Sequence, residues 1–454
     1  MRQIYDETIW DCIVAGSGPA GLGAAAAFAR LGGKVLVLEA AGQPGGTICA
    51  VPFMPVNRLR VRGEKRSDVH EAFLESLMSF GSAACYPGPE DGINGDGFCT
   101  HPEYAELAIY RLAEKEGFEL RLFSPVIDAV TEDRQIREII VREKRGMVHY
   151  RAKVYIDATG DGDLAAAAGC SFRAGKTEEA ADPSSAMDAD FMLRTQNVAE
   201  KAIHMPITLG FSLTGVEAEP FLAWMEENVG TFKEILGEED GKGRHVAAWY
   251  AFNRGTAEGI MGVNNGAWVH QKLTSDGLNS ADLTDARRNG VRVAADLADI
   301  LREHHIPGCE HCALDRVGGI LGVRDTRRIE GEYVLTYKDS QKSGEFEDTI
   351  ARKYGAIDAN QLFIGKMDSG FAYPYRSLIP AAVDNLLLAG RCGSATFLGH
   401  SAGKSMGNMM ALGCAAGAAA GLSVKEGLSP RKLDVQQLRK TLADVLHVQY
   451  LFPL

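Results

Sequence analysis

The sequence predicts an α/β protein built around a parallel βαβ unit, and three features near the N-terminus support this prediction. Residues 10–15 (WDCIVA) form a short apolar run typical of a buried strand, and KVLVL at residues 34–38 forms a second one. A glycine-rich turn and an alanine-rich segment at residues 22–31 lie between these two runs. A strand, a glycine turn, a helix and a second strand within about 30 residues indicate two parallel strands joined by a crossover helix.

Composition and charge narrow the class of protein. A chain of 454 residues is too long for one compact core and fits two lobes. The net charge of −12 argues against a nucleic-acid partner, which needs a basic face, and gives no support to binding of anionic lipid. Nine scattered cysteines and a start without an apolar leader lead us to expect a cytoplasmic protein. Residues 411–424 are apolar but shorter than the about 20 residues that span a membrane, so we expect a packed internal helix there and no membrane association.

A dinucleotide-binding motif, GSGPAG at residues 16–21, follows the first predicted strand. Gly16 permits the tight turn, Gly18 lets the backbone approach a pyrophosphate, and Gly21 allows the helix to pack closely on the sheet. The phosphates would lie at the positive end of the helix that begins near Pro19. Glu39 ends the second strand, where its carboxylate can accept hydrogen bonds from ribose hydroxyls. The combination predicts a dinucleotide site but does not separate NAD from FAD.

The rest of the chain leaves this unit and later returns to it. A middle block lacks βαβ signatures and contains a predicted helix at residues 282–302. Residues 385–389 (NLLLA) predict a further central strand, and residues 405–426 predict a long helix rich in glycine and alanine. We therefore expect three segments. Residues 1–170 would form the first part of the dinucleotide-binding domain, residues 171–375 an interleaved α+β substrate domain, and residues 376–454 the C-terminal part of the first domain.

Further motifs resemble those of FAD-dependent oxidoreductases whose FAD-binding domain is of the glutathione-reductase type, a broad family. The resemblance covers nearly the whole chain and implies FAD as the cofactor in a Rossmann-like domain. Because no second G-x-G-x-x-G occurs, we expect no built-in NAD(P)H domain. Besides residues 16–21, the motifs are Gly45-Gly46-Thr47, residues 157–163 (DATGDGD), residues 322–328 (GVRDTRR), residues 374–378 (PYRSL), Ala389-Gly390-Arg391 and residues 409–417.

The resemblance also implies where FAD would be held. Glu39 and the glycines of residues 16–21 would hold the ADP half, and the backbone around Val126 would meet the adenine. Gly160 and Asp161 would lie beside the ribose and pyrophosphate, although Asp161 and Asp163 can equally be helix-capping acids. The full set of expected cofactor-binding residues is Gly16, Gly18, Pro19, Ala20, Gly21, Glu39, Ala40, Gly45, Gly46, Thr47, Val126, Thr159, Gly160, Asp161, Gly390, Arg391, Gly403, Lys404, Ser405 and Met406.

The segment at residues 400–408 (HSAGKSMGN) opens the glycine-rich helix, so its unpaired N–H groups and positive dipole end point at whatever lies before it. In flavoproteins of this type that is the pyrimidine edge of the flavin, where fixed donors stabilise the reduced state. Lys404 would add charge there, unless it is an ordinary surface lysine. His400 is the candidate proton acceptor or donor, because its usual pKa of about 6.5 suits the task. A structural, hydrogen-bonded histidine is the alternative.

Arginines suggest the substrate class. Arg324 and Arg376 are the candidates for binding a carboxylate, because a guanidinium forms paired hydrogen bonds with two oxygens. A small carboxylated or polyhydroxylated substrate is therefore expected, with Tyr373 as a further candidate for proton exchange. Ion pairing of these arginines with acids such as Asp325 is the alternative.

Cys309 and Cys312 form a C-x-x-C pair, preceded by His304 and His305. Such a pair can be a redox dithiol or half of a metal site, but no second C-x-x-C completes a zinc site. We therefore expect structural thiols and no metal.

Three functions fit these features. The first is an FAD-dependent dehydrogenase or reductase that transfers a hydride and is reoxidised or reduced by an unidentified electron acceptor or donor. The second is a flavin monooxygenase, which needs NAD(P)H and oxygen. The third is a flavin-binding partner protein, for instance in RNA modification, against which the acidic charge weighs.

Overall fold

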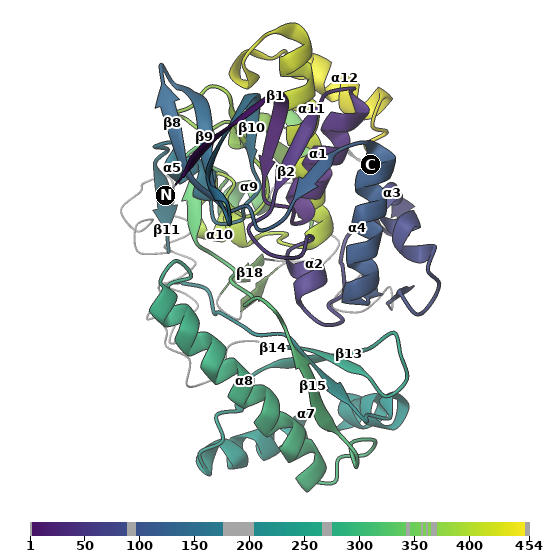
Figure 1. Ribbon diagram of the computed structural model, residues 1–454. Coiled ribbons are helices and arrows are strands. Elements are labelled where there is room, and N and C mark those ends of the chain that lie inside the picture. Colours follow the sequence, from purple (N-terminus) through teal and green to yellow (C-terminus); the bar gives the residue numbers. More distant parts are fainter. Residues whose placement is uncertain are drawn as a thin grey trace.

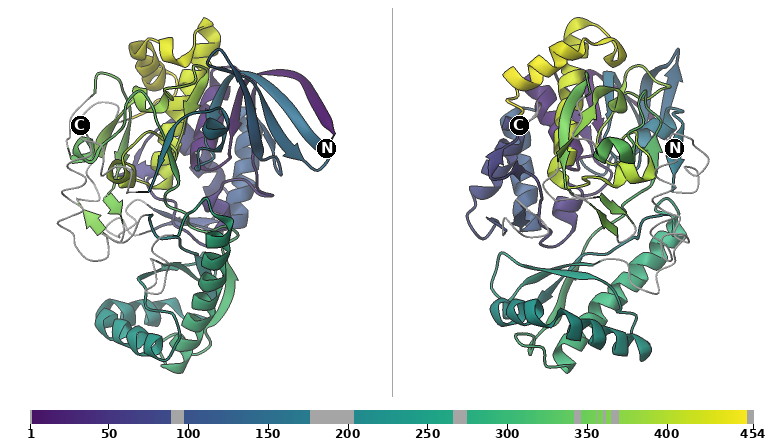
Figure 2. Two further views of the ribbon diagram at one scale, coloured as in Figure 1. Left: turned by 90° about the vertical axis from the view of Figure 1, so that its left-hand side faces the viewer. Right: turned by 180° about the vertical axis from the view of Figure 1, so that it is seen from behind.

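A computed structural model describes residues 2–88, 97–175, 204–265, 275–341, 346–355, 357–359, 362–364 and 370–449. The described chain forms two lobes, and both termini lie in the first lobe (Figure 1). The second lobe hangs from one end of the first, as the views from the side and from behind also show (Figure 2).

The first lobe is built on a mixed sheet. Its strands follow the order β7-β2-β1-β10-β9-β8, and β21 also pairs with β10. The strands β7, β2, β1, β10 and β21 are parallel, whereas β8 and β9 form an antiparallel hairpin extension beside β10. The bounds are β1 Gln3–Ala15, β2 Val35–Leu38, β7 Glu119–Arg121, β8 Val126–Glu132, β9 Gln135–Glu143, β10 Gly146–Asp157 and β21 Leu386–Leu388. The predicted βαβ unit and returning strand are confirmed, although the first strand begins seven residues earlier than its apolar core (Gln3 against Trp10).

Two long helices, α1 (Pro19–Arg30) and α11 (Met406–Glu426), pack directly on one another. Glycines make the close approach: a Cβ on Gly413 would lie 1.9 Å from the Ala20 carbonyl oxygen, and one on Gly417 would lie 2.1 Å from that of Ala24. No side chain larger than hydrogen fits at such distances. Because these contacts pair early residues of α1 with early residues of α11, the helices run in the same direction and begin at the same end of the lobe.

The apolar helix α11 is a core helix. Its length and composition alone would allow it to cross a membrane, but most of its apolar window is buried inside the protein. Its residues Leu412 and Cys414 are both almost fully buried. The remaining helices of this lobe are α2 Thr47–Ala50, α3 Asp68–Met78, α4 Pro102–Glu116, α5 Asp163–Ala167, α9 Tyr337–Gln341, α10 Phe397–Ser401 and α12 Val435–Asp444.

The second lobe has its own core. Four antiparallel strands in the order β13-β14-β12-β15 pack against two helices, α7 and α8, both of which Figure 1 places in the lower lobe. Their bounds are β12 Phe211–Thr214, β13 Tyr250–Arg254, β14 Met261–Asn265, β15 Ala313–Val317, α7 Ala218–Gly241 and α8 Ser280–Glu303. The predicted helix at residues 282–302 matches α8, and its N-cap is the Asn279 side chain, which accepts from the N–H of Ala281.

The chain returns to the first lobe earlier than the sequence suggested. We expected the substrate domain to extend to residue 375, but the core of the second lobe ends at Val317. Strand β16 (Arg327–Ile329) pairs with β11 (Phe172–Ala174), and β17 (Thr349–Tyr354) pairs with β20 (Gly370–Pro374). Ile350, Phe371 and Tyr373 all belong to the same core as α1 and α11. Short irregular strands carry no βαβ pattern, which is why the return could not be recognised in these residues.

Several shorter elements complete the described structure. They are β3 Arg60–Val61, β4 Glu64–Lys65, β5 Cys85–Pro87, β6 Phe98–Thr100, β18 Ile357–Ala359, β19 Leu362–Ile364, η3 Tyr375–Leu378 and η4 Pro430–Lys432.

Candidate functional site

Four loops meet at the carboxyl ends of the parallel strands, and we call them the cofactor loops: residues 16–21, 45–47, 158–162 and 389–391. A Cβ on Gly16 would lie 2.5 Å from the Ala158 carbonyl oxygen, so the first and third loops touch through bare backbone. The Ala389 N–H donates to the Asp157 carbonyl at 2.8 Å, which places the fourth loop beside the third. In open sheets of parallel strands, ligands bind beyond this edge.

The second cofactor loop docks on the first. The Gly45 N–H donates to the Ser17 carbonyl at 3.0 Å, and a Cβ on Gly46 would lie 3.3 Å from the Gly18 Cα. Both Gly45 and Gly46 have positive φ, which favours glycine, and Thr47 then begins α2. The structure thus places Gly45 and Gly46 beside the dinucleotide-binding motif at residues 16–21.

Glu39 lies at the end of β2 next to the first loop. Its Oε2 accepts from the N–H of Ser17 at 2.8 Å and from the Ser17 hydroxyl at 2.6 Å, and its Oε1 accepts from the N–H of Ala41. The backbone of Ser124, two residues before Val126, donates to the Glu39 carbonyl at 2.8 Å. Val126 is therefore near the acid, on the side where the sequence placed the adenine. Ala40 is exposed beside them.

Asp157, which we had not singled out, organises the third loop. Its Oδ1 accepts from the N–H and the hydroxyl of Thr159, and its Oδ2 accepts from the N–H of Ala165 at 2.8 Å. The carboxyl group is fully buried, and burial raises its pKa to about 6 against the opposing effect of these hydrogen bonds. Its position at the last residue of a buried strand is the signal that would have found it.

Asp161 is not a helix cap. The N-cap of α5 is Gly162, whereas the Asp161 carboxylate accepts from Arg391 at 2.7 Å and from the Thr326 hydroxyl at 2.8 Å. Asp163 is the first residue of α5 and pairs with Arg327 at 2.8 Å, so the capping-type role applies to Asp163. A Cβ on Gly160 would lie 3.0 Å from the Arg391 guanidinium, so the third and fourth loops also meet through side chains.

The amino end of α11 lies beyond these loops. Ser405 is its N-cap residue, but the buried Ser405 hydroxyl caps no N–H and has no hydrogen-bond partner among the residues that the structure describes. Met406 is the first residue of the helix, and Gly403 before it has φ of +58°. The segment that we expected to open one helix contains a break, because His400 belongs to the separate short helix α10.

His400 is buried, with 6% of its surface exposed. Its Nε2 donates to the Arg324 carbonyl oxygen at 2.9 Å, which leaves Nδ1 as the acceptor in the neutral ring. Burial lowers the pKa of His400 well below its usual value, and the nearby Lys404 and Arg328 lower it further. His400 is therefore uncharged near neutral pH.

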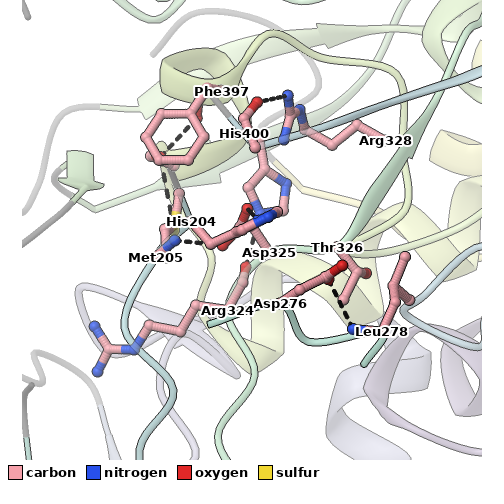
Figure 3. Close-up of polar contacts among 12 residues, drawn as sticks. His204, Met205, Asp276, Leu278, Arg324, Asp325, Thr326, Arg328, Phe397 and His400 are labelled. Atoms are coloured by element: carbon pink, nitrogen blue, oxygen red, sulfur yellow. Dashed lines mark hydrogen bonds and ion pairs between the residues drawn. The ribbon is translucent and has the colours of Figure 1, made fainter. Parts of the chain in front are cut away.

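A second histidine, which sequence reasoning missed, faces the same place. His204 Nδ1 lies 3.1 Å from Asp325 Oδ2, and the N–H of Met205 donates to the other oxygen at 2.5 Å. The hydrogen bond with Asp325 raises the pKa of His204, with a further contribution from Asp276. Figure 3 shows His204, Asp325 and His400 close together, whereas the Arg324 side chain extends away from them.

Two lysines complete what we call the charged cluster: His204, Asp325, Lys353, His400 and Lys404. The Lys404 Nζ donates to the Met205 sulfur at 3.0 Å. Lys353 of β17 is 4% exposed, and its ammonium lies 5.6 Å from the Phe371 ring and 5.7 Å from the Tyr373 ring. Burial lowers the pKa of Lys353 to about 7, and the charge of Lys404 acts in the same direction.

The arginines differ from expectation. Arg376 is 48% exposed at its side chain and forms a paired contact with Asp348, at 3.0 and 3.2 Å. Arg328 is buried and donates to the carbonyl oxygens of Ala395 and Gly175. Tyr373 is buried in the core beside Lys353, and burial raises its pKa. Of the four predicted catalytic residues, His400 and the Arg324 backbone lie in the charged cluster, the Tyr373 ring packs against its Lys353, and Arg376 is paired elsewhere.

The comparison with known families identifies the chain. A family model described as FAD dependent oxidoreductase matches residues 11–442. The protein belongs to this family. It is therefore an oxidoreductase with FAD as its cofactor, as the sequence predicted. The finer assignment of the FAD domain to the glutathione-reductase type stays a prediction.

Individual proteins resemble the chain only partly. One of the subunits of opine oxidase from Rhizobium meliloti (strain 1021) is 54% identical over 41 residues, which are 9% of this chain and 9% of that protein. A geranylgeranyl bacteriochlorophyll reductase-like protein from Thermoplasma acidophilum is 14% identical, with 98% of this chain and 85% of that chain covered and a TM-score of 0.46. The p-nitrophenol 4-monooxygenase of Pseudomonas putida DLL-E4 is 15% identical, with 98% and 88% covered and a TM-score of 0.47.

The residues present fit FAD. Within the described parts of the chain, a Cβ on Gly18 would meet no atom within 4 Å, so packing there does not explain why glycine stands at this position, whereas close approach of a pyrophosphate does. The Ser405 hydroxyl, buried and unpartnered at the amino end of α11, is suited to a ligand that brings its own polar atoms. The two ends of the site thus each have a feature that the protein alone leaves unexplained.

The C-x-x-C pair lies far from these loops, in the core of the second lobe. Cys309 and Cys312 are fully buried free thiols, and the hydrogen bond between them raises the pKa of Cys309 and lowers that of Cys312. Among the residues that the structure describes, no group of three or more His, Cys, Asp or Glu side chains is arranged to hold a metal ion.

Proposed function

We propose that this oxidoreductase oxidises or reduces a small organic molecule that carries a carboxylate or several hydroxyl groups, by hydride transfer to or from FAD. When bound, FAD supplies the two-electron acceptor or donor. The residues of the charged cluster bind and orient the substrate and move the accompanying proton.

The single observation that supports this proposal is the His204–Asp325 pair. A buried carboxylate that accepts from Nδ1 fixes the ring orientation and leaves Nε2 as a base, as in other histidine–carboxylate pairs. Asp325, which pairs with His204, is followed in the chain by Thr326. The Thr326 hydroxyl donates a hydrogen bond to Asp161 of the third cofactor loop. The pair therefore stands on the segment that joins the cofactor loops to the second lobe.

His204 takes the role of proton acceptor or donor that we had expected for His400. The hydrogen bond with Asp325 raises the pKa of His204, whereas burial lowers that of His400 and holds its ring neutral. His400 instead offers Nδ1 as a hydrogen-bond acceptor and, through its bond to the Arg324 carbonyl, fixes the backbone beside Asp325. The proposal gives Arg376 and Tyr373 no part in proton transfer, because Arg376 is paired with Asp348 and the Tyr373 ring belongs to the core.

The test is an anaerobic screen of small hydroxy acids, amino acids, sugars and amines against the yellow holoenzyme. Opines, the compounds in the name of the partly similar relative, belong in this screen. A substrate is identified when it bleaches the flavin absorbance without any nicotinamide cofactor. Bleaching that is unchanged in His204→Asn would show that the pair has no part in the reaction.

The flavin monooxygenase reaction is an alternative outcome of the same experiment. In that case none of the compounds bleaches the flavin alone, and NADPH is consumed only when both oxygen and substrate are present. The hydride-transfer proposal would then be wrong, although the family assignment would stand.

A further inference from the structure

Lys353 stands out among the charged side chains because nothing in the described structure balances it. Its ammonium makes no hydrogen bond and belongs to no ion pair of the described residues, although it is almost fully buried. An isolated charge in such surroundings is costly and is retained only where it is deprotonated or meets an opposite charge. Two aromatic rings face it, and ring faces offset only part of this cost.

The neighbours of Lys353 place it at the amino end of α11. A Cβ on Gly403 would lie 3.1 Å from the Lys353 Cβ, so the lysine lies against the turn that precedes the helix. This is also the turn that carries Lys404 and ends at Ser405, whose buried hydroxyl has no partner. The turn before the 21-residue helix thus packs against Lys353, and in the part of the chain that the structure describes neither the Lys353 ammonium nor the Ser405 hydroxyl has a hydrogen-bond partner.

The same lysine adjoins the cofactor loops. Tyr373, whose ring faces Lys353, has its hydroxyl 2.7 Å from where a Cβ of Gly393 would stand. The N–H of Gly393 donates to the Gly390 carbonyl of the fourth cofactor loop at 3.2 Å. Lys353 therefore lies between that loop and the turn before α11.

We propose that Lys353, together with Lys404 and the amino end of α11, forms a binding site for the carboxylate of the substrate. This inference rests on the proposed function and narrows its substrate class from carboxylated or polyhydroxylated compounds to carboxylates. The pairing of three other cations supports it. Arg376 is committed to Asp348, Arg391 to Asp161 and Arg327 to Asp163, so these guanidinium groups are engaged within the protein.

The flanking rings suggest the form of the ligand. Phe371 and Tyr373 give the site apolar walls beside the ammonium, so a carboxylate attached to a flat or apolar group fits better than a strongly hydrated inorganic anion. Benzoate is therefore the probe, and benzamide, which has nearly the same shape and no charge, is its neutral counterpart.

Charge on Lys353 makes binding depend on pH. His400 is neutral in the working range and Tyr373 keeps its proton because burial raises its pKa, while Arg328 is permanently charged. Lys404 adds a second ammonium, and His204 titrates as part of a pair with Asp325. Lys353, with its pKa near 7, is the buried cation whose charge changes between pH 6 and pH 9.

The experiment measures the dissociation constant of benzoate from the oxidised holoenzyme by the change in the flavin absorbance spectrum. Because only the charged lysine binds, wild-type affinity should fall about tenfold per pH unit above pH 7. Lys353→Met should bind benzoate at least about tenfold more weakly at pH 6 and lose this dependence. Lys353→Arg should bind benzoate at every pH, because arginine keeps its charge. Benzamide should bind all three alike.

The same titrations include a control variant and show which outcomes would contradict the proposal. Lys338→Met removes an exposed lysine of α9 in the same lobe and should leave benzoate binding unchanged. Benzoate affinity that is equal in wild type and Lys353→Met would overturn the proposal. So would a lowered flavin midpoint potential in Lys353→Met with benzoate affinity intact, because the lysine would then serve the reduced cofactor. Benzoate binding needs no turnover. A failed substrate screen would therefore refute the proposed function, while the benzoate titrations would still test the role of Lys353.

Discussion

The cofactor loops and the charged cluster are neighbours, but they are built in different ways. In the loops, glycines let backbone touch backbone, as where a Cβ on Gly21 would lie 1.9 Å from the Gly16 carbonyl oxygen. In the cluster, side chains from distant segments meet, such as His204 and Asp325, which are 121 residues apart. The loops depend mainly on close backbone packing and the cluster on charged side chains, so substitutions should separate binding of FAD from turnover.

The largest expected effect comes from two glycines of the same loop. Gly18→Val should fold but purify without FAD, because its Cβ would meet no atom of the described residues within 4 Å and its side chain would occupy the place of the pyrophosphate. Gly21→Val should fail to fold, because its Cβ collides with backbone. FAD content from the visible spectrum and the far-UV circular dichroism check both results.

Gly230→Ala in α7 is the control, since its Cβ meets nothing and it lies in the second lobe. Stoichiometric FAD in Gly18→Val would show that the first loop does not hold the pyrophosphate.

The second-largest expected effect is a slower reaction in a variant that still binds FAD. His204→Asn should slow flavin bleaching by the identified substrate about 100-fold or more, because removal of a general base typically costs that much. FAD content should stay that of wild type. Stopped-flow absorbance under anaerobic conditions measures the rate.

A matched control exists in the second lobe, where His304 Nε2 lies 3.0 Å from Glu239 in a similar pair. His304→Asn should leave the rate unchanged. Equal slowing by both substitutions would mean that His204 acts through stability rather than through the reaction.

A smaller effect is expected at Asp157, the buried acid whose hydrogen bonds organise the third cofactor loop. Asp157→Asn keeps the shape but turns one acceptor into a donor that faces an N–H of Ala165 or Thr159. We expect a loss of about 2 kcal/mol in the free energy of unfolding, the cost of leaving buried polar groups unpaired. Urea denaturation measures it, and a variant as stable as wild type would contradict this account of the third loop.

The smallest effect is a pH dependence of stability. Because the pKa of Lys353 is depressed to about 7 in the folded protein, the unfolded chain binds more protons above that pH. The free energy of unfolding of wild type should therefore rise by about 1 kcal/mol relative to Lys353→Met between pH 7 and pH 8. Parallel pH curves for the two proteins would show that the lysine is not buried as an uncompensated cation.

Much of the first lobe could be predicted from sequence because its signals are local. The glycine spacing of residues 16–21, the acid Glu39 and the apolar runs of β1, β2 and β21 each reflect the conformation of a few neighbouring residues. The helix α8 was predicted for the same reason. Family resemblance then supplied FAD, which the residues alone had left open.

The sequence therefore determined the dinucleotide-binding unit through its residues, and the cofactor and the class of enzyme through its family resemblance. Only the tertiary structure decided which polar residues act together. It pairs Arg376 with Asp348, neutralises His400 by burial, and brings His204 to Asp325 and Lys353 to Lys404. The physical reason is that a charge or a pKa depends on neighbours that are distant in the chain, and no local pattern records them.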